Sequence, residues 1–389
     1  MKITNFRYVI YVLVIIGALT IGSINNRTMK QVELASGLGV EKVDEQYVVS
    51  LQIFNPAANK KDAQDLIGGY TYTQSGKTVP EAIQKIKKMS WKKPILDTLQ
   101  VVVLGEQLLK EEGLTKTIDY LVRDTRIPAN VIILTIKEYS PDTFFHIFTQ
   151  QQKLSSLYAS TLLHNTEQSY GRLIKNSPER LKSILVDESS GDLMLPYLQI
   201  VGDIEKGLTK SNIEGFTPSE QLEFGGFSVL KDDKLHSYFT SEESNTIALI
   251  YNIDQVVSMS VNCPGSEETF TMDTIHTGSK LKVKKENTFD LKVQIEGNVE
   301  ELSCTEKLPL STGLHSLEKQ LEKTYKEKID ALFEKTISDG IDIFRFKDTL
   351  YRQDPKSWKQ VKEDKDYLST VKINTNVEVS LVRTGHIGL

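Results

Sequence analysis

The stretch TLQVVVLGEQLLKEEGLTKTIDYLVRDTRIPANVIILTIK, residues 98–137, decides the fold of the N-terminal half of the chain. Residues 98–105 are a near-continuous apolar run that ends at Gly105, which is typical of a strand covered on both faces. Residues 106–124 carry apolar side chains at helical spacing, and residues 130–137 form a second apolar run. Strand, helix and strand in this order predict a βαβ-like unit, in a domain that combines helices with a mixed sheet.

The sequence before this unit predicts a hairpin, a short strand and a helix. Residues 32–40 and 47–54 are typical of two strands joined by a turn at Asp44, and a short strand is expected at 70–73. Pro80 suits the first turn of a helix. The side chains expected on the buried face of that helix are Ala82, Ile83, Ile86 and Met89.

The sequence after the βαβ-like unit predicts helices and then a linker. Residues 140–188 show no strand pattern, and both Ser140 and Ser177 precede a proline, a pairing that marks helix starts. A strand is expected at 193–201. The stretch 207–221, rich in Gly, Ser, Thr, Asn and Pro, is typical of a boundary between domains.

The C-terminal half shows the period-two alternation of strands that have one buried and one exposed face. A hairpin is expected over 222–238, followed by a short helix that Thr240 caps. Three alternating strands follow between 257 and 296, and a last strand, 371–381, is expected in the same antiparallel sheet. The apolar positions of 314–337 lie three and four residues apart and predict a long helix packed on that sheet.

These patterns place the chain in the α+β class. The expected parts are a signal or anchor segment at 1–26, an N-terminal domain of mixed α/β type at 27–206, a linker at 207–221, and a C-terminal domain at 222–389. The C-terminal domain is expected to be an antiparallel sheet packed by the long helix.

The first residues have the composition of an export signal. Lys2 and Arg7 flank the start of an apolar run over 8–22 that carries no charge. The run is shorter than the roughly 20 residues of a comfortable transmembrane helix, so both a cleaved signal and a retained anchor are open. The two basic residues predict that the chain after Ser23 lies outside the cytoplasm.

Composition narrows the class of protein further. Of 389 residues, Lys and Arg number 47 and Asp and Glu 52, which gives a net charge near −5 without a concentrated basic region. That balance argues against a protein that binds nucleic acid, because such a protein needs a basic face. The 39% apolar and 25% charged residues are ordinary values for folded domains.

No motif for catalysis, a cofactor or a metal stands out. Residues 75–78 match the end of a phosphate loop, but Thr71 stands where its first glycine is required. Gly37 and Gly39 begin a dinucleotide pattern that Lys42 interrupts, so close packing of the strand is the expected role of these glycines. No two histidines stand at ligand spacing on one helix; they are His146, His164, His236, His276, His315 and His386.

Two cysteines and two acidic pairs complete the search for chemistry. Cys263 and Cys304 are too few for a structural zinc site, and in an exported chain they form either a disulfide or two buried thiols. The adjacent carboxylates of Glu242 and Glu243, like those of 267–268, favour a solvated surface over acid–base catalysis. We therefore expect a binding or scaffolding protein and no enzyme.

Several stretches share their order and spacing with one known family. They are 33–40, 48–56, 76–82, 99–106, 119–124, 224–235, 350–358 and 377–385. Through them the chain resembles the Ger(x)C family, the C subunits of nutrient germinant receptors in endospore-forming bacteria. The resemblance covers nearly the whole chain after residue 30.

The resemblance implies a family domain in each half, no catalysis, and a place on the outer face of the spore inner membrane. It also implies two integral membrane partners, the A and B subunits, with which the family couples small nutrients to germination. Members usually carry a lipid-bearing cysteine after the leader. Here Ser23 stands in that place, and its hydroxyl cannot form a thioether to diacylglycerol. We therefore favour an uncleaved leader as the anchor over release of a soluble protein.

The function expected on these grounds is that of a non-catalytic, membrane-anchored receptor subunit needed for assembly or signalling. Two other hypotheses stay open. In the first, the chain is a module that itself captures the nutrient. In the second, it is an exported cell-wall hydrolase, and the absence of a catalytic motif argues against this hypothesis.

Overall fold

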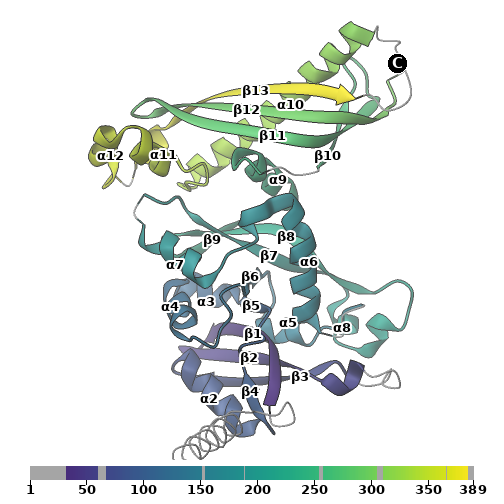
Figure 1. The fold of residues 1–389 in the computed structure, drawn as a ribbon, viewed down its shortest axis with the longest axis vertical. Helices are drawn as coiled ribbons and strands as arrows, with labels where there is room; N and C mark the ends of the chain where they lie inside the picture. The colour runs from purple at the N-terminus through teal and green to yellow at the C-terminus, as the bar shows by residue number, and fades with distance from the viewer. Residues whose placement is uncertain are drawn as a thin grey trace, which may run out of the picture.

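The computed structural model describes residues 32–59, 67–150, 154–187, 189–253, 257–304, 310–364 and 366–383. Its strands form two sheets, one of nine strands and one of four, which lie towards opposite ends of an elongated molecule (Figure 1). Helices accompany both sheets, so the predicted α+β class is confirmed. The expected leader, 1–26, lies outside the described residues.

The first sheet has the strand order β3-β2-β1-β5-β6-β7-β8-β9, with β4 paired to β1. Strands β1, β5, β6 and β7 run parallel to one another, whereas the hairpin partners on either side are antiparallel, so the predicted mixed sheet is confirmed. The bounds are β1 (Val32–Val43), β2 (Gln46–Phe54), β3 (Gly69–Gly76), β4 (Lys93–Ile95), β5 (Val101–Leu104), β6 (Ile132–Ile136), β7 (Leu193–Gly202), β8 (Glu220–Lys231) and β9 (Lys234–Thr240).

Helices cover both faces of this sheet, as the apolar run at 98–105 predicts. Val102 and Leu104 of β5 are buried against one set of helices, and Val101 and Val103 against another, because successive side chains point to opposite faces. The first set is α2 (Val79–Met89), α3 (Glu106–Glu111), α4 (Thr115–Arg123) and α7 (Pro178–Val186). The second is α5 (Pro141–Phe145), α6 (Ser155–Tyr170) and α9 (Ser241–Ile250).

Two details of the predicted helices are wrong. The single helix expected over 106–124 is broken into α3 and α4 at Gly113, whose φ is +93°. The carboxylate of Asp233, from the β8–β9 turn, accepts hydrogen bonds from the N–H groups at the start of α4, which local sequence cannot foresee. Met89, expected on the buried face of α2, is exposed because the helix ends there.

The second sheet has the order β10-β11-β12-β13 and is not wholly antiparallel. Strand β13 pairs with β12 in the parallel direction, which corrects the sequence prediction. The connection between them is a helical crossover, and such a crossover returns the chain to the same end of the sheet. The bounds are β10 (Ser258–Asn262), β11 (Thr269–Lys285), β12 (Thr288–Leu302), α10 (Leu310–Ser338), α11 (Phe346–Gln353), α12 (Pro355–Val361), α13 (Tyr367–Thr370) and β13 (Lys372–Arg383).

The long helix α10 packs against this sheet as predicted. Its buried side chains recur three and four positions apart and belong to one hydrophobic core with the inward side chains of β11, β12 and β13. They are Leu317, Leu321, Tyr325, Ile329 and Leu332.

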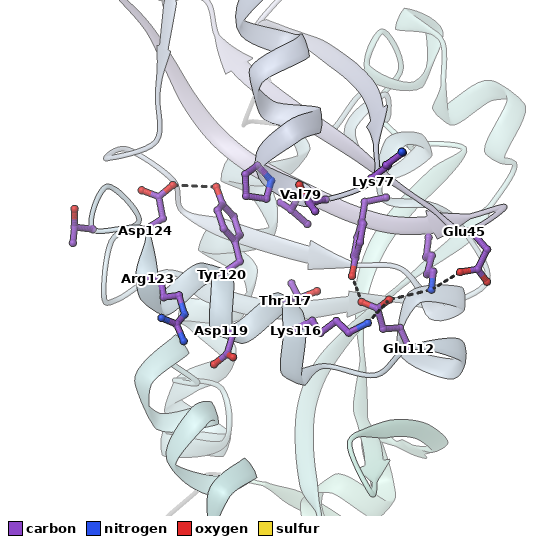
Figure 2. Close-up of a pocket in the computed structure, with 15 residues that line it drawn as sticks. Glu45, Lys77, Val79, Glu112, Lys116, Thr117, Asp119, Tyr120, Arg123 and Asp124 are labelled. Carbon is purple, nitrogen blue, oxygen red and sulfur yellow. Dashed lines mark hydrogen bonds and ion pairs between the residues drawn. The ribbon is translucent and has the colours of Figure 1, made fainter.

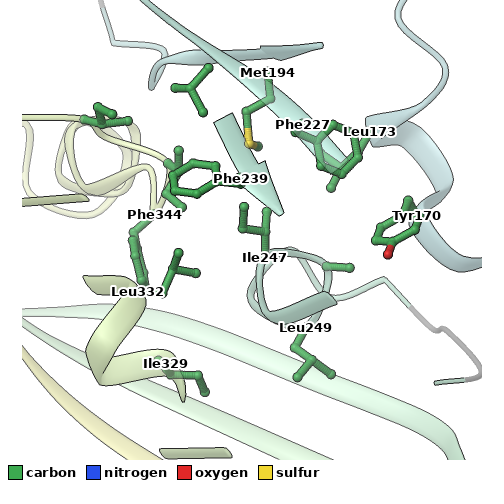
Figure 3. Close-up of a cluster of buried hydrophobic side chains, with 14 of the residues drawn as sticks. Tyr170, Leu173, Met194, Phe227, Phe239, Ile247, Leu249, Ile329, Leu332 and Phe344 are labelled. Atoms are coloured by element: carbon green, nitrogen blue, oxygen red, sulfur yellow. The ribbon is translucent and has the colours of Figure 1, made fainter. Parts of the chain in front are cut away.

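The two sheets share one hydrophobic core through α9. Figure 3 shows Ile247 of α9 beside Phe239 of the first sheet, with Leu249 on the side of the second sheet and Ile329 of α10 nearby. The hairpin β8–β9, which follows the expected linker, extends the first sheet. The short helix α8 (Ile204–Gly207) precedes it. The division of the chain into domains at 207–221 stays a prediction.

A reciprocal pair of hydrogen bonds between Asp192 and Asp342 also joins the two halves. The N–H of Asp342 donates to Oδ2 of Asp192 at 2.7 Å, and the N–H of Asp192 donates to the carbonyl of Asp342 at 3.2 Å. Gly191 permits this approach, since a Cβ there would lie 2.3 Å from the same carbonyl oxygen. Burial raises the pKa of Asp192 to about 6.

Candidate functional site

An open groove of about 900 Å³ lies where the β1–β2 hairpin meets α2 and α4 (Figure 2). It is lined by polar and charged side chains of both signs together with two tyrosines. The hairpin contributes Lys42, Glu45 and Tyr47, the start of α2 contributes Lys77, Thr78 and Val79, and the α3–α4 region contributes Glu112, Lys116, Thr117, Asp119, Tyr120, Arg123 and Asp124.

Glu112 is the centre of the groove's hydrogen-bond network. Its carboxylate accepts hydrogen bonds from the Tyr47 hydroxyl and from Lys42 Nζ at 3.0 Å, and Lys116 Nζ lies 3.4 Å away. Burial acts to raise the pKa of Glu112, but the donors from these three side chains outweigh it and hold the pKa below its usual value. Burial and the neighbouring carboxylate raise the pKa of Tyr47, so at neutral pH the phenol donates to an ionised acid.

A second acid–phenol pair closes the other end of the groove. The Tyr120 hydroxyl donates to Oδ2 of Asp124 at 3.0 Å, and Nε of Arg126 donates to Oδ1 of Asp124 at 2.7 Å. The arginine is the main cause that lowers the pKa of Asp124. Both of these partly buried acids are therefore ionised and paired with donors.

The start of α2 explains the rejected phosphate-loop match at 75–78. Oγ1 of Thr78 accepts a hydrogen bond from the N–H of Glu81 and caps the helix. Gly76 allows the chain to turn tightly into the helix, because a Cβ there would lie 2.7 Å from the N atom of Ala82. Thr78 lines one wall of the groove together with Lys77 and Val79.

Each acid of the groove has a basic or phenolic partner. The carboxylates of Glu112 and Asp124 accept from lysine, arginine and tyrosine donors, and those of Glu45 and Asp119 lie within ion-pair distance of lysines. Over the ranges that the structure describes, no group of three or more His, Cys, Asp or Glu side chains could hold a metal ion. Cations and anions that face one cavity can bind a small polar molecule that carries both charges.

Sequence reasoning did not find this groove. Tyr47 and Glu112 are 65 residues apart, and Lys42 and Glu112 are 70 apart. Only the fold brings them together. The one signal of the groove in the sequence was the predicted turn at Asp44, which has the charged residues Lys42 and Glu45 beside it.

The residues that the sequence singled out take other positions. Cys263 and Cys304 are joined as a disulfide with their Cα atoms 5.9 Å apart. Glu242 pairs with Lys328 at 2.8 Å, and Glu243 caps α9 and pairs with Lys335, so this acidic pair links α9 to α10. Ser23 lies outside the described residues.

The histidines remain scattered in the fold. The five that the structure describes, His146, His164, His236, His276 and His315, are all exposed. His386 lies outside the described part of the chain. The same part of the chain contains no helix that is both long and apolar enough to span a bilayer.

Both halves of the chain match models of one protein family. Residues 25–200 match the spore germination protein N-terminal domain, and residues 225–385 match the C-terminal domain described as spore germination B3/GerAC-like. The chain belongs to this family of spore germination proteins. The resemblance to the Ger(x)C family found in the sequence is thereby confirmed.

Relatives in this family are similar along nearly their full lengths. Spore germination protein KC of Bacillus subtilis (strain 168) is 27% identical over 380 residues, which cover 94% of this chain and 92% of that protein. Spore germination protein B3 of the same organism is 24% identical, with 93% and 94% covered.

The crystal structure of the GerBC protein has the same fold. It superposes with a TM-score of 0.55 at 16% identity and covers 89% of this chain and 97% of that one. At this identity the likeness concerns the fold alone.

Proposed function

We propose that this spore germination protein is the non-catalytic, extracytoplasmic subunit of a nutrient germinant receptor. In this proposal the leader holds it on the outer face of the spore inner membrane, where it contacts two integral membrane partners, the A and B subunits. Its work is assembly or signalling by contact. The observation that carries the proposal is the pair of family matches, which run through both halves of the chain.

The geometry of the chain supports a role by contact. Each sheet ends in strands that pair on one side only, and such edges offer main-chain donors and acceptors to a partner. The outward side chains of β13 include lysine, asparagine and glutamate. Such polar and charged side chains discourage non-specific pairing of another strand with that edge. The acids in the groove are engaged as acceptors, which supports a role without catalysis.

Co-purification from spore membranes tests the proposal. The full chain, tagged at its C-terminus and extracted in mild detergent, is expected to bring down two polytopic membrane proteins in comparable amounts. A tagged variant that lacks residues 1–26 serves as the control for membrane placement. Recovery of the full chain without polytopic partners would contradict the proposal.

The groove favours a second candidate, direct binding of a small zwitterionic nutrient. Lysines and carboxylates face the same cavity, which suits the two charges of an amino acid. Calorimetry of the full chain in detergent with individual germinants tests this function. Saturable heat that Glu112→Gln removes would support it, and the absence of heat with every germinant that triggers the spores would contradict it.

A further inference from the structure

One end of the first sheet exposes large apolar side chains next to lysines. Trp91 is 89% exposed, Met89 57% and Tyr70 54%. Single exposed apolar residues are ordinary on protein surfaces, but here they come from neighbouring elements, the end of α2, the approach to β4 and the start of β3. Tyr70, Trp91 and Lys92 line one shallow cavity of about 330 Å³.

The chain enters the described structure beside this cluster. Val32, the first residue of β1, pairs with Lys93 of β4, two positions after Trp91. The apolar run at 8–22 ends only nine residues before Val32. Nine residues span at most about 30 Å when fully extended, so a leader held in a bilayer keeps this end of the molecule close to the lipid.

The side chains in the cluster have the chemistry of a bilayer interface. Tryptophan and tyrosine favour the headgroup region, and lysines extend along apolar surface towards anionic headgroups. Lys87 and Lys88 form the last turn of α2, and Lys92 Nζ lies 5.7 Å from the centre of the Trp91 ring. The second sheet lies at the far end of the molecule (Figure 1).

We propose that the α2–β4 end, with Met89 and Trp91 at its tip, rests in the headgroup layer of the membrane. The occupant of this surface is an anionic lipid bilayer. The inference rests on the proposed anchoring, and it adds an orientation: the first sheet faces the lipid and the second sheet points away from it.

Tryptophan fluorescence of the full chain in vesicles tests this contact. The sequence contains two tryptophans, Trp91 and Trp358, and Trp358 is only 7% exposed. The vesicles are made of phosphatidylglycerol and phosphatidylcholine whose acyl chains are brominated near the headgroup. Bromine at this depth quenches the fluorescence of nearby indole rings. The Trp91 signal is the part of the emission that Trp91→Phe removes. In the brominated vesicles the wild-type chain is expected to lose most of this signal by quenching. Its emission maximum is also expected at a shorter wavelength than in detergent-free buffer.

The matched control carries Ile275→Trp in the Trp91→Phe background. Ile275 is exposed on β11 of the second sheet, so its replacement is expected to escape quenching. Equal quenching of the Trp91 and Ile275→Trp signals, or no quenching of Trp91, would overturn the inference. Equal quenching of Trp91 in vesicles of phosphatidylcholine alone would contradict a contribution of the lysines and of anionic lipid to the contact.

Flotation of the same vesicles separates this inference from the proposed function. If the chain floats but Trp91 is not quenched, the proposed anchor is supported and the proposed orientation is contradicted. That result would point to a protein partner at this surface. A chain that does not float with the vesicles contradicts both the anchor and the contact.

Discussion

Glu220 is a buried carboxyl at the start of β8. Its Oε2 lies 3.3 Å from Nδ2 of Asn212, and its Oε1 has no hydrogen-bond partner among the described residues. Burial raises the pKa of Glu220 to about 7. Because the folded protein then holds this proton more tightly than the unfolded chain does, the protonated form favours folding.

The stability of the protein is therefore expected to fall as the pH rises from about 4.5 to about 7, and this contribution is level above that range. Glu220→Gln is expected to lose much of this slope, measured as the melting temperature across pH. The exposed Glu223→Gln is the control and should keep the slope. If the dependence of stability on pH is unchanged in Glu220→Gln, it arises from another group. Asp192 is the next candidate, because burial raises the pKa of Asp192 to about 6.

Glu112 illustrates the opposite case, a carboxylate held ionised by donors. Glu112→Gln keeps the size of the side chain but removes the charge that Lys42 and Tyr47 meet. We expect a loss of about 1–2 kcal/mol in the free energy of unfolding, measured with urea, because hydrogen bonds to a charged group are lost in a partly buried place. Glu45→Gln, on the exposed side of Lys42, should change stability by less than about 0.5 kcal/mol. Equal effects would contradict this reading of the groove.

Glycines in β1 let helices approach the first sheet. A Cβ on Gly37 would lie 2.6 Å from the ring of Phe145 and 2.8 Å from Cβ of Ser156. The sequence predicts close packing at this glycine, and the structure identifies α5 and α6 as the elements that pack there.

Gly37→Ala is therefore expected to destabilise the protein by about 1–3 kcal/mol, because a well-packed interface has no room for the added carbon. The free energy of unfolding in urea measures the effect. Gly278→Ala in β11 is the matched control, since its Cβ would meet only Gln294 at an ordinary 3.8 Å. Similar costs at the two positions would assign the effect to backbone conformation instead of to packing.

Strands and helices whose signals are local were predictable from the sequence. The apolar run before Gly105, the alternation around Phe289 and the serine–proline helix starts each reflect neighbours in the chain. The break at Gly113 was missed because the carboxylate of Asp233, more than a hundred residues away, supports it. The direction of β13 was missed because alternation fixes which face is buried and says nothing about strand direction.

The groove was not predictable for a related reason. Its members come from a hairpin turn, a helix start and a helix break, and each of them alone has the composition of ordinary surface. Only the pairing of β1 with β5 places Lys42 beside Glu112.

The disulfide fastens the end of the second sheet. Cys263 follows β10 and Cys304 follows β12, at a sequence separation of 41. A cross-link that closes a loop of this length stabilises a protein by about 2–4 kcal/mol. Mass spectrometry without reductant is expected to find one peptide pair that contains both cysteines, and the Cys263→Ser, Cys304→Ser double variant is expected to melt at a lower temperature. Two free thiols in the protein isolated from spores would contradict this prediction.

The two sheets are expected to unfold together, because α9 and the contact between Asp192 and Asp342 join their cores. In the proposed receptor this coupling allows a contact made at one sheet to affect the other. In the proposed receptor the folded chain lies outside the cytoplasm and is held at the membrane.

Protease treatment of decoated spores tests that claim most directly. The protein is expected to be cleaved while the inner membrane is intact and a cytosolic reporter remains uncut, and a fragment that carries the leader should stay with the membrane pellet. Protection of the whole chain until the membrane is permeabilised, with cleavage only then, would contradict the account.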